Sequence, residues 1–177
     1  MEQVENVSQE AASDSSCSYY DIWFSRLMEK RSFKESIDFY MQEISRFLQK
    51  KEMVFFKYIP SHHSLVASQS IVLDVETIRG VGLDLTKEDE NFRIEKLSRP
   101  MELKGFSDVV ANALNMKEFF AFPLVVEGVP EGIMVLLGAQ EEAHNDPYIK
   151  ICTSALSLKL ANINLAKKLH TVSIHDD

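Results

Sequence analysis

Residues 118–138 read "EFFAFPLVVEGVPEGIMVLLG", and this stretch determines the fold class expected for the chain. Two apolar runs flank the segment "EGVPEG", whose glycines and proline are typical of the connection in an antiparallel hairpin. Neither run alternates polar and apolar residues, as a strand with one face in solvent would. The sequence therefore predicts a β-hairpin in a sheet that is covered on both faces.

The elements before the hairpin extend this pattern. Apolar residues at spacings of three and four predict a helix over 33–48, and Ser32 with Glu35 predicts a capping box at its start. Compact β-rich runs predict strands at 53–59 and 64–73, followed by a weaker third strand at 77–85 that contains two glycines.

Three further helices are predicted. The first covers 87–97, the second covers 105–116 with Ser107 as its N-cap, and the third runs from Pro147 onward. Pro147 suits a first helical turn, where the N–H that proline lacks is not needed. Strands that cluster in hairpins, with long helices at the sequence ends, indicate an α+β fold with helices on the faces of an antiparallel sheet.

The expected division of the chain has four parts. Residues 1–16 are acidic and serine-rich and are expected to form a disordered tail. An apolar N-terminal helix is expected within 17–31, a core over 32–146, and a C-terminal signalling helix over 147–177. A chain of 177 residues with 45% hydrophobic content suits one globular core.

Composition excludes several classes of function. The net charge of −8 and the pI near 5.2 provide no basic field for nucleic acid or anionic lipid. No signal peptide and no apolar run of the roughly 18–20 residues that a membrane span requires is present, so a cytoplasmic protein with no membrane partner is expected. Cys17 and Cys152 form no CxxC pair, so no metal site is predicted.

Certain residues of the hairpin resemble the closing pair of strands in a GAF domain. These are Pro123-Leu124 at the opening of the first strand, Gly128 in the turn, and Gly132-Ile133 at the start of the second. The similarity covers roughly residues 33–170. It implies a GAF-like antiparallel sheet with helices on its faces and a small-molecule pocket between the sheet and the segment that covers it.

The ligand motifs of the GAF family are absent. Asp89-Glu90 matches part of the cyclic-nucleotide motif, but Leu85 stands at the place of its phenylalanine. Residues 53–138 contain no cysteine for bilin attachment or sulfoxide reduction, and the histidines lie in turns, in loops or at the chain end. We therefore expect no cofactor and no metal, and no nucleophile–base pair or carboxylate dyad indicates catalysis by this chain.

If a pocket exists, its lining is expected to be apolar and aromatic, with no identified ligand. The alternative is that the same side chains simply fill the core. The candidate residues are Phe56, Tyr58, Phe92, Met101, Phe106, Phe120 and Phe122.

The last residues, "VSIHDD", resemble the start of a bacterial GGDEF diguanylate cyclase domain, with Asp176 or Asp177 as its first aspartate. This resemblance implies that the chain is the N-terminal sensory half of such an enzyme, which makes cyclic di-GMP, and that a GGDEF output domain follows. The alternative is a stand-alone GAF protein that binds protein partners or a small molecule.

The final helix is apolar nearly all round, so one sheet face cannot cover it, and the N-terminal helix poses the same problem. Pairing of both helices across a two-fold axis would bury them, which predicts a parallel homodimer. The residues expected at the dimer interface are Trp23, Phe24, Leu27, Ile149, Cys152, Leu156, Leu160 and Ile163.

Overall fold

The computed structural model describes residues 20–49, 52–71, 73–87, 104–115, 119–138 and 146–175. They form a five-stranded sheet in the order β3-β2-β1-β5-β4, in which all neighbouring strands are antiparallel. The strands are β1 Met53–Ile59, β2 Ser64–Ile71, β3 Gly82–Asp84, β4 Phe119–Val126 and β5 Val129–Leu137. The helices are α2 Phe33–Phe47, α3 Val75–Ile78, α4 Lys104–Ala113 and α6 Pro147–His175, with the 3-10 helix η1 Leu85–Lys87.

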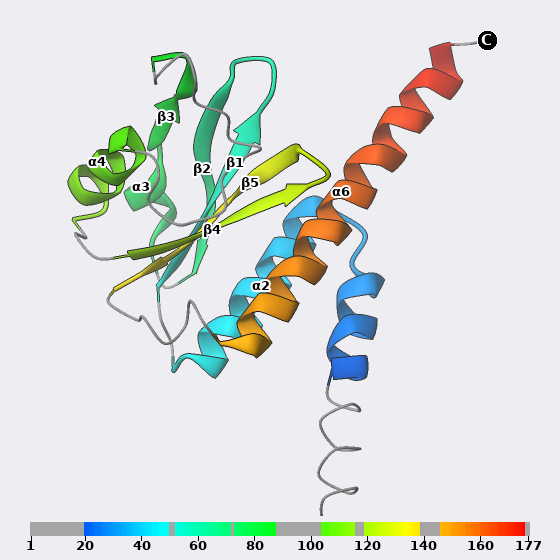
Figure 1. Ribbon diagram of the computed structural model, residues 1–177, viewed down its shortest axis with the longest axis horizontal. Helices are drawn as coiled ribbons and strands as arrows, with labels where there is room; N and C mark the ends of the chain where they lie inside the picture. Colours follow the sequence, from blue (N-terminus) through cyan, green and yellow to red (C-terminus); the bar gives the residue numbers. More distant parts are fainter. Residues whose placement is uncertain are drawn as a thin grey trace, which may run out of the picture.

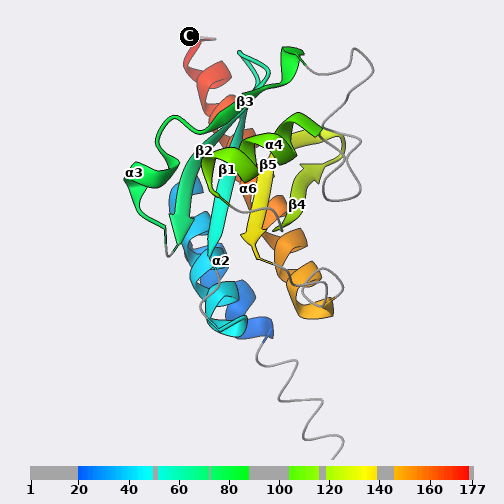
Figure 2. The ribbon, with the colours of Figure 1, turned by 90° about the vertical axis from the view of Figure 1, so that its left-hand side faces the viewer.

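The sheet lies between two layers of helices (Figure 1). Helices α2 and α6 cover one face, and α4 lies on the other, in front of the strands in Figure 2. Each layer has its own core because successive strand residues point to opposite faces. In β1, for example, Phe55 belongs to the core under α2 and α6, whereas Phe56 belongs to the core under α4. This architecture confirms the predicted α+β class.

The predicted hairpin is present as β4 and β5, and it contains a β-bulge. Leu124 pairs with Gly132 and Val125 pairs with Pro130, so Glu131 has no partner on β4. Gly132 is required by close approach: a Cβ there would lie 2.7 Å from the Phe55 ring and still closer to the carbonyl oxygen of Phe56. A side chain larger than hydrogen would therefore push β5 away from β1.

Capping explains where the two long helices begin. The Ser32 hydroxyl accepts a hydrogen bond of 3.1 Å from the N–H of Glu35, as predicted. The Glu35 carboxylate accepts from the N–H of Arg31 instead of closing the capping box on Ser32. At the start of α6, the Asp146 carboxylate accepts from the N–H of Tyr148 at 2.8 Å, and Pro147 occupies the first helical position.

Two sequence predictions were wrong. The third strand is only Gly82–Asp84, because the chain forms α3 before it and η1 after it. Ser107 lies inside α4 and not at its N-cap, because the helix already begins at Lys104. The predicted helix over 87–97 and the predicted disordered tail lie outside the described residues, apart from Lys87 at the end of η1.

A further helix covers residues 20–29 (blue in Figure 1) and lies beside α6. The rings of Tyr20 and Tyr148 are 5.8 Å apart, and the Lys159 ammonium donates to the carbonyl oxygen of Met28 at 3.0 Å. The first contact joins the beginnings of the two helices and the second lies further along both. The helix over 20–29 therefore runs parallel to α6.

Candidate functional site

The described members of the predicted pocket do not share one cavity. Phe56 is fully buried and packs with Tyr58 in the core under α4, whereas Phe120 and Phe122 are partly buried on the opposite face of the sheet. Phe106 lies in α4, and Phe92 and Met101 lie outside the described residues. For Phe56, the filled-core alternative is the one that the structure supports.

The structure places most of the predicted dimer interface inside a single chain. Phe24 and Ile163 are partly buried, and the other members are almost completely covered by α2, the sheet and each other. These other members are Trp23, Leu27, Ile149, Cys152, Leu156 and Leu160. They are therefore not available to a partner, and the prediction chose the wrong side of each helix.

The exposed apolar side chains of α6 lie on its other side. They are Ile151 (41% exposed), Leu158 (54%), Leu165 (56%) and Leu169 (62%). We call these four residues the outward stripe. The outward stripe faces away from the chain's own core. Its last two residues, Leu165 and Leu169, lie in the segment 165–171, in which every residue is exposed. Figure 1 shows this end of α6 extending beyond the sheet.

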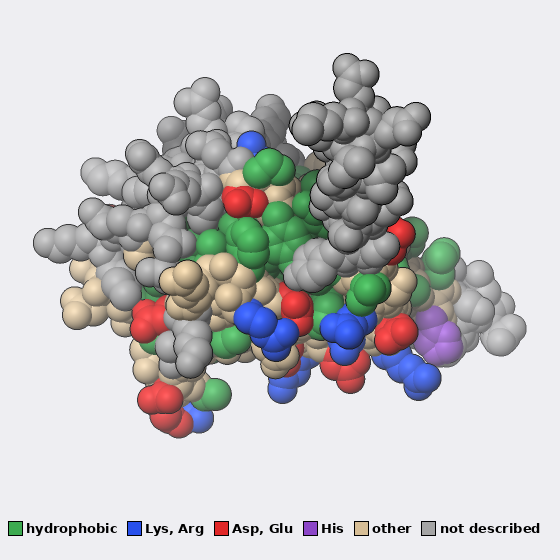
Figure 3. Space-filling model, turned by 90° about the horizontal axis from the view of Figure 1, so that it is seen from below, with side chains coloured by type: hydrophobic (Ala, Val, Ile, Leu, Met, Phe, Trp, Pro, Cys, Tyr) green, Lys and Arg blue, Asp and Glu red, His purple; other side chains and the backbone are tan. Residues whose placement is uncertain are grey.

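Two grooves flank the first turns of the outward stripe. A groove of about 680 Å³ lies between α6 and β4 and is lined by Phe122, Val126 and Ser157, among others. A groove of about 470 Å³ lies between α6 and the helix over 20–29 and is lined by Phe24 and Met28. Seen from below in Figure 3, hydrophobic side chains gather between the grey segments, so apolar surface is exposed at this end of the molecule.

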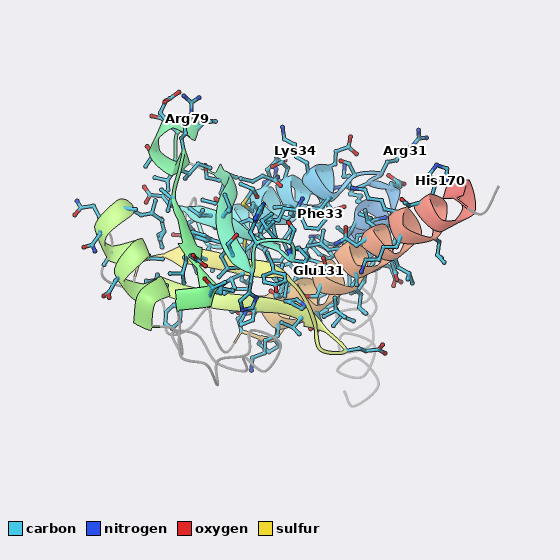
Figure 4. All side chains as sticks on the ribbon, turned by 90° about the horizontal axis from the view of Figure 1, so that it is seen from above. Arg31, Phe33, Lys34, Arg79, Glu131 and His170 are labelled. Atoms are coloured by element: carbon cyan, nitrogen blue, oxygen red, sulfur yellow. The ribbon has the colours of Figure 1, made fainter. Side chains whose placement is uncertain are left out.

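A third cavity, of about 340 Å³, lies where α6 leaves the sheet. We call it the root cavity. Its lining includes Phe33 of α2, Lys57 of β1, Glu131 of β5, and Asn164, Lys167 and Lys168 of α6. Figure 4 shows Glu131 between the end of the sheet and α6. Three cations and one carboxylate thus meet at the base of the projecting part of the helix.

The β-bulge explains why Glu131 reaches this cavity. Ile133, Val135 and Leu137 point to the α4 face, so a regular strand would send Glu131 there as well. The unpaired residue reverses the alternation, and Glu131 instead accepts a hydrogen bond from the Asn164 side-chain amide of α6. The side chain is only 5% exposed.

Burial raises the pKa of the Glu131 carboxyl above its usual range. The Asn164 hydrogen bond and the positive charges of Lys168 and Lys57 oppose this rise without cancelling it. Sequence reasoning missed Glu131 because "EGVPEG" was interpreted as a turn. The available signal was a charged residue directly before Gly132, next to an apolar run.

The other buried polar groups have structural roles. The Tyr40 hydroxyl lies 2.6 Å from the Thr153 hydroxyl, and burial raises the pKa of Tyr40 well above its usual range. Burial also raises the pKa of the Cys152 thiol to about 12, so the reactive thiolate is scarce at neutral pH. Within the described part of the chain, no cluster of His, Cys, Asp or Glu could hold a metal ion, and no helix has both the length and the apolar character to cross a membrane.

No protein-family model matches the chain, and no curated protein matches it either. Solved structures are similar. Residues 122 to 287 of a methyl-accepting chemotaxis protein share 20% identity with a TM-score of 0.58, over 82% of this chain and 98% of that one. The GAF domain of an Acinetobacter phosphoenolpyruvate-protein phosphotransferase shares 15% identity with a TM-score of 0.61, over 85% and 95%.

The GAF domain of the cyanobacteriochrome TePixJ is also similar, with 12% identity and a TM-score of 0.54, over 78% of this chain and 95% of that one. At these identities the comparisons establish the fold and not the ligand or the partner. The chain has a GAF-like α+β fold.

Proposed function

We propose that the chain is a regulatory module that pairs in parallel with a second copy through α6 and controls an attached diguanylate cyclase. The observation that carries the proposal is the outward stripe of α6. Ile151 and Leu158 lie opposite the buried side of α6, and Leu165 and Leu169 continue the same stripe past the sheet, where the helix is exposed all round. Such a surface is costly in water unless another apolar surface covers it.

The spacing along α6 indicates that the covering surface is another helix. Positions of the outward side follow one another in alternating steps of four and three residues, which is the pattern of a two-stranded coiled coil. The exposed positions are Ile151, Leu158, Asn162, Leu165 and Leu169, whereas Ala155, which occupies the intervening position of the pattern, is buried in the chain's own core. A row of apolar side chains along an exposed helix forms a shallow surface, which suits pairing with another helix better than enclosure of a small ligand.

Asn162 favours a second copy of this chain as the occupant. It is exposed and stands at an a position, between Leu158 and Leu165 at d positions. A single asparagine at an a position specifies register and a two-stranded state, because its amide can hydrogen-bond to the same residue across the axis. In a parallel pair, Asn162 would meet the partner's Asn162.

A parallel pair would bring the C-terminal ends of two α6 helices together, and a small rotation at their contact could then align or separate whatever follows them. The proposal of a diguanylate cyclase as that output rests on the resemblance of residues 172–177 to the start of a GGDEF domain. Such an enzyme joins two GTP molecules held by two catalytic domains, so control of how two chains face each other would control its activity. One of the proteins with a similar structure is a methyl-accepting chemotaxis protein, which agrees with a sensory role.

The alternative function, a stand-alone module that binds a small molecule, is favoured by one specific observation. The root cavity contains a buried carboxylate and three lysines. Ligand binding there and pairing through α6 are compatible, because the two surfaces differ.

Light scattering tests the pairing. The chain should show about twice its 20.2 kDa mass, and Leu165→Asp should reduce this to one chain mass because it places a charge in the seam. The matched control is Val75→Asp, at a position 69% exposed on α3, away from α6. A wild-type protein of one chain mass at high micromolar concentration would contradict the proposal.

Cross-linking tests the direction of the pair. In a Cys17→Ser background, Leu169→Cys should form a disulfide between two chains, because equal a positions face each other only in a parallel, in-register pair. Asn162→Val should keep the chains associated but weaken this preference for one register. An antiparallel pair, in which residue 169 does not cross-link, would exclude the parallel arrangement.

Enzyme assay tests the output. In the protein that carries the attached domain, Leu165→Asp should lower the rate of cyclic di-GMP formation from GTP, while Val75→Asp should not. Equal rates in the two variants would contradict control through α6.

A further inference from the structure

The root cavity carries charges that its own residues do not neutralise. The whole chain has a net charge of −8, yet Lys57, Lys167 and Lys168 line one cavity with Glu131 as its acidic member. Within the described ranges, none of the three lysines forms an ion pair. The Lys57 ammonium instead lies over the Phe33 ring, 5.0 Å from its centre. Positive charge is therefore available at the rim of the cavity.

Only one of the two carboxylate oxygens of Glu131 accepts a hydrogen bond from a described residue. Its Oε2 atom accepts from the Asn164 amide, whereas no described residue donates to Oε1. Among the described residues, the only buried side-chain polar atom without a hydrogen-bond partner is Nε1 of Trp23, so Oε1 of Glu131 is not sealed in the core but is open to the cavity. The floor of the cavity thus presents a carboxylate oxygen that an N–H or O–H donor of a ligand can reach.

We infer that the root cavity binds a small zwitterion, whose amino group donates to Oε1 of Glu131 and whose carboxylate or phosphate is held by Lys57, Lys167 and Lys168. The volume of about 340 Å³ lies at the small end of the range of ligand sites. An amino acid or an amino phosphate has both required groups a few bonds apart. A simple anion would contact the lysines but would bring no donor to Oε1.

The position of the cavity gives such a ligand a direct effect on α6. Lys57 and Glu131 belong to the sheet, whereas Asn164, Lys167 and Lys168 belong to α6 at the point where it becomes exposed. A ligand held by both groups would fix the direction in which α6 leaves the sheet. This inference rests on the proposed function for its regulatory meaning, but the cavity is made by one chain, so binding does not depend on pairing.

Thermal unfolding and NMR spectroscopy test the binding. L-aspartate and O-phosphoethanolamine are the two zwitterionic probes; succinate and ethanolamine are their controls, which lack the amino group and the anionic group respectively. At least one zwitterion should raise the melting temperature, since a ligand that binds only the folded state stabilises it, and should shift the side-chain amide signals of Asn164. The probe that acts distinguishes a carboxylate ligand from a phosphate ligand.

Matched variants locate the site. Lys57→Gln and Lys168→Gln should each weaken binding of the active probe by roughly tenfold or more, because each removes one charge-assisted contact. Lys34→Gln removes the same charge from an exposed lysine of α2 that does not line the cavity, and should leave the affinity unchanged.

Three results would overturn the inference. These are no shift with either zwitterion, an equal effect of succinate and L-aspartate, or an equal loss of affinity in Lys34→Gln and Lys168→Gln. The proposed function can fail without the ligand inference failing. If light scattering gives one chain mass, pairing is rejected, but the probes can still be titrated against the single chain. If the protein shows two chain masses but neither probe shifts its melting temperature or its Asn164 signals, the ligand inference is rejected and the proposed pairing is not.

Discussion

Both sides of α6 carry large aliphatic side chains, but one side is buried in the core and the other is exposed. The inward side places Leu156 and Leu160 in the core, whereas the outward side leaves Leu158 and Leu165 more than half exposed. The difference lies in the polar residues between them. Thr153 and Ser157, on the inward side, donate their hydroxyls to backbone carbonyls of the same helix at 2.7 and 2.9 Å.

The outward side carries polar residues that cannot be buried in this way. Lys150 and Asn162 stand among its apolar residues, and a lysine ammonium cannot be satisfied by the carbonyls of its own helix turn. In this part of α6, the buried polar residues Thr153 and Ser157 satisfy their hydroxyls within the helix, whereas Lys150 and Asn162 are exposed.

The largest expected effect separates the two sides directly. Leu156→Ala should lower the free energy of unfolding by about 2–5 kcal/mol, because it leaves a cavity in a fully buried site. Leu158→Ala, two residues away, should change the stability of the single folded chain by less than about 0.5 kcal/mol. Urea unfolding of dilute protein measures both, and similar losses would show that the outward side is also part of the chain's own core.

The fold could be predicted from the sequence because its signals are local. The hairpin 118–138 and the strand 53–59 are apolar runs bounded by turn residues, and the structure has β4, β5 and β1 there. The third predicted strand was mostly wrong because "TIRGVGLDL" contains two glycines and no alternation strong enough to decide its extent. The extent of this strand is set by its pairing with β2, in which only Gly82, Leu83 and Asp84 take part.

The candidate sites could not be predicted in the same way because they depend on register. A single unpaired residue in β5 moves Glu131 from the α4 face to α6, and no periodicity in the sequence signals that bulge. The side of α6 that faces the core likewise depends on which residues meet α2 in three dimensions, such as Tyr40 and Thr153.

Gly132→Ala would test the bulge that brings Glu131 to the inward side of α6. We expect a loss of about 1–3 kcal/mol in unfolding free energy, because the added methyl group meets the Phe55 ring and the backbone of Phe56. The Asn164 side-chain amide signals should also move. In Val129→Ala, at a half-exposed position of the same hairpin, those signals should stay in place. Movement in both variants would mean that the bulge is not the cause.

Glu131→Gln is expected to give a smaller change that depends on pH. Burial raises the pKa of the folded-state carboxyl, so the folded protein holds its proton to higher pH than the unfolded chain. Wild-type stability should therefore rise as pH falls through the folded-state pKa and level off below the unfolded-state pKa. The amide of the variant does not ionise, so the stability advantage of the variant at pH 7 should shrink in acid. A difference between the two proteins that is constant with pH would contradict this account.

The smallest expected effect concerns how the helix over 20–29 is held beside the outward stripe. Lys159 donates from α6 to the carbonyl oxygen of Met28, near the C-terminal end of that helix, where the carbonyls lack helical partners and a cation is favourable. Removing this contact should cost about 0.3–1 kcal/mol. Because Trp23 and Leu27 remain buried in the core, Lys159→Gln should loosen the helix locally without unfolding the chain. Hydrogen exchange should therefore speed up at residues 24–29 and stay unchanged in the sheet. Lys34→Gln, the same substitution on the exposed side of α2, should alter neither region. If exchange accelerates equally in both variants, the contact between Lys159 and Met28 contributes nothing specific, and the buried side chains alone hold the helix in place.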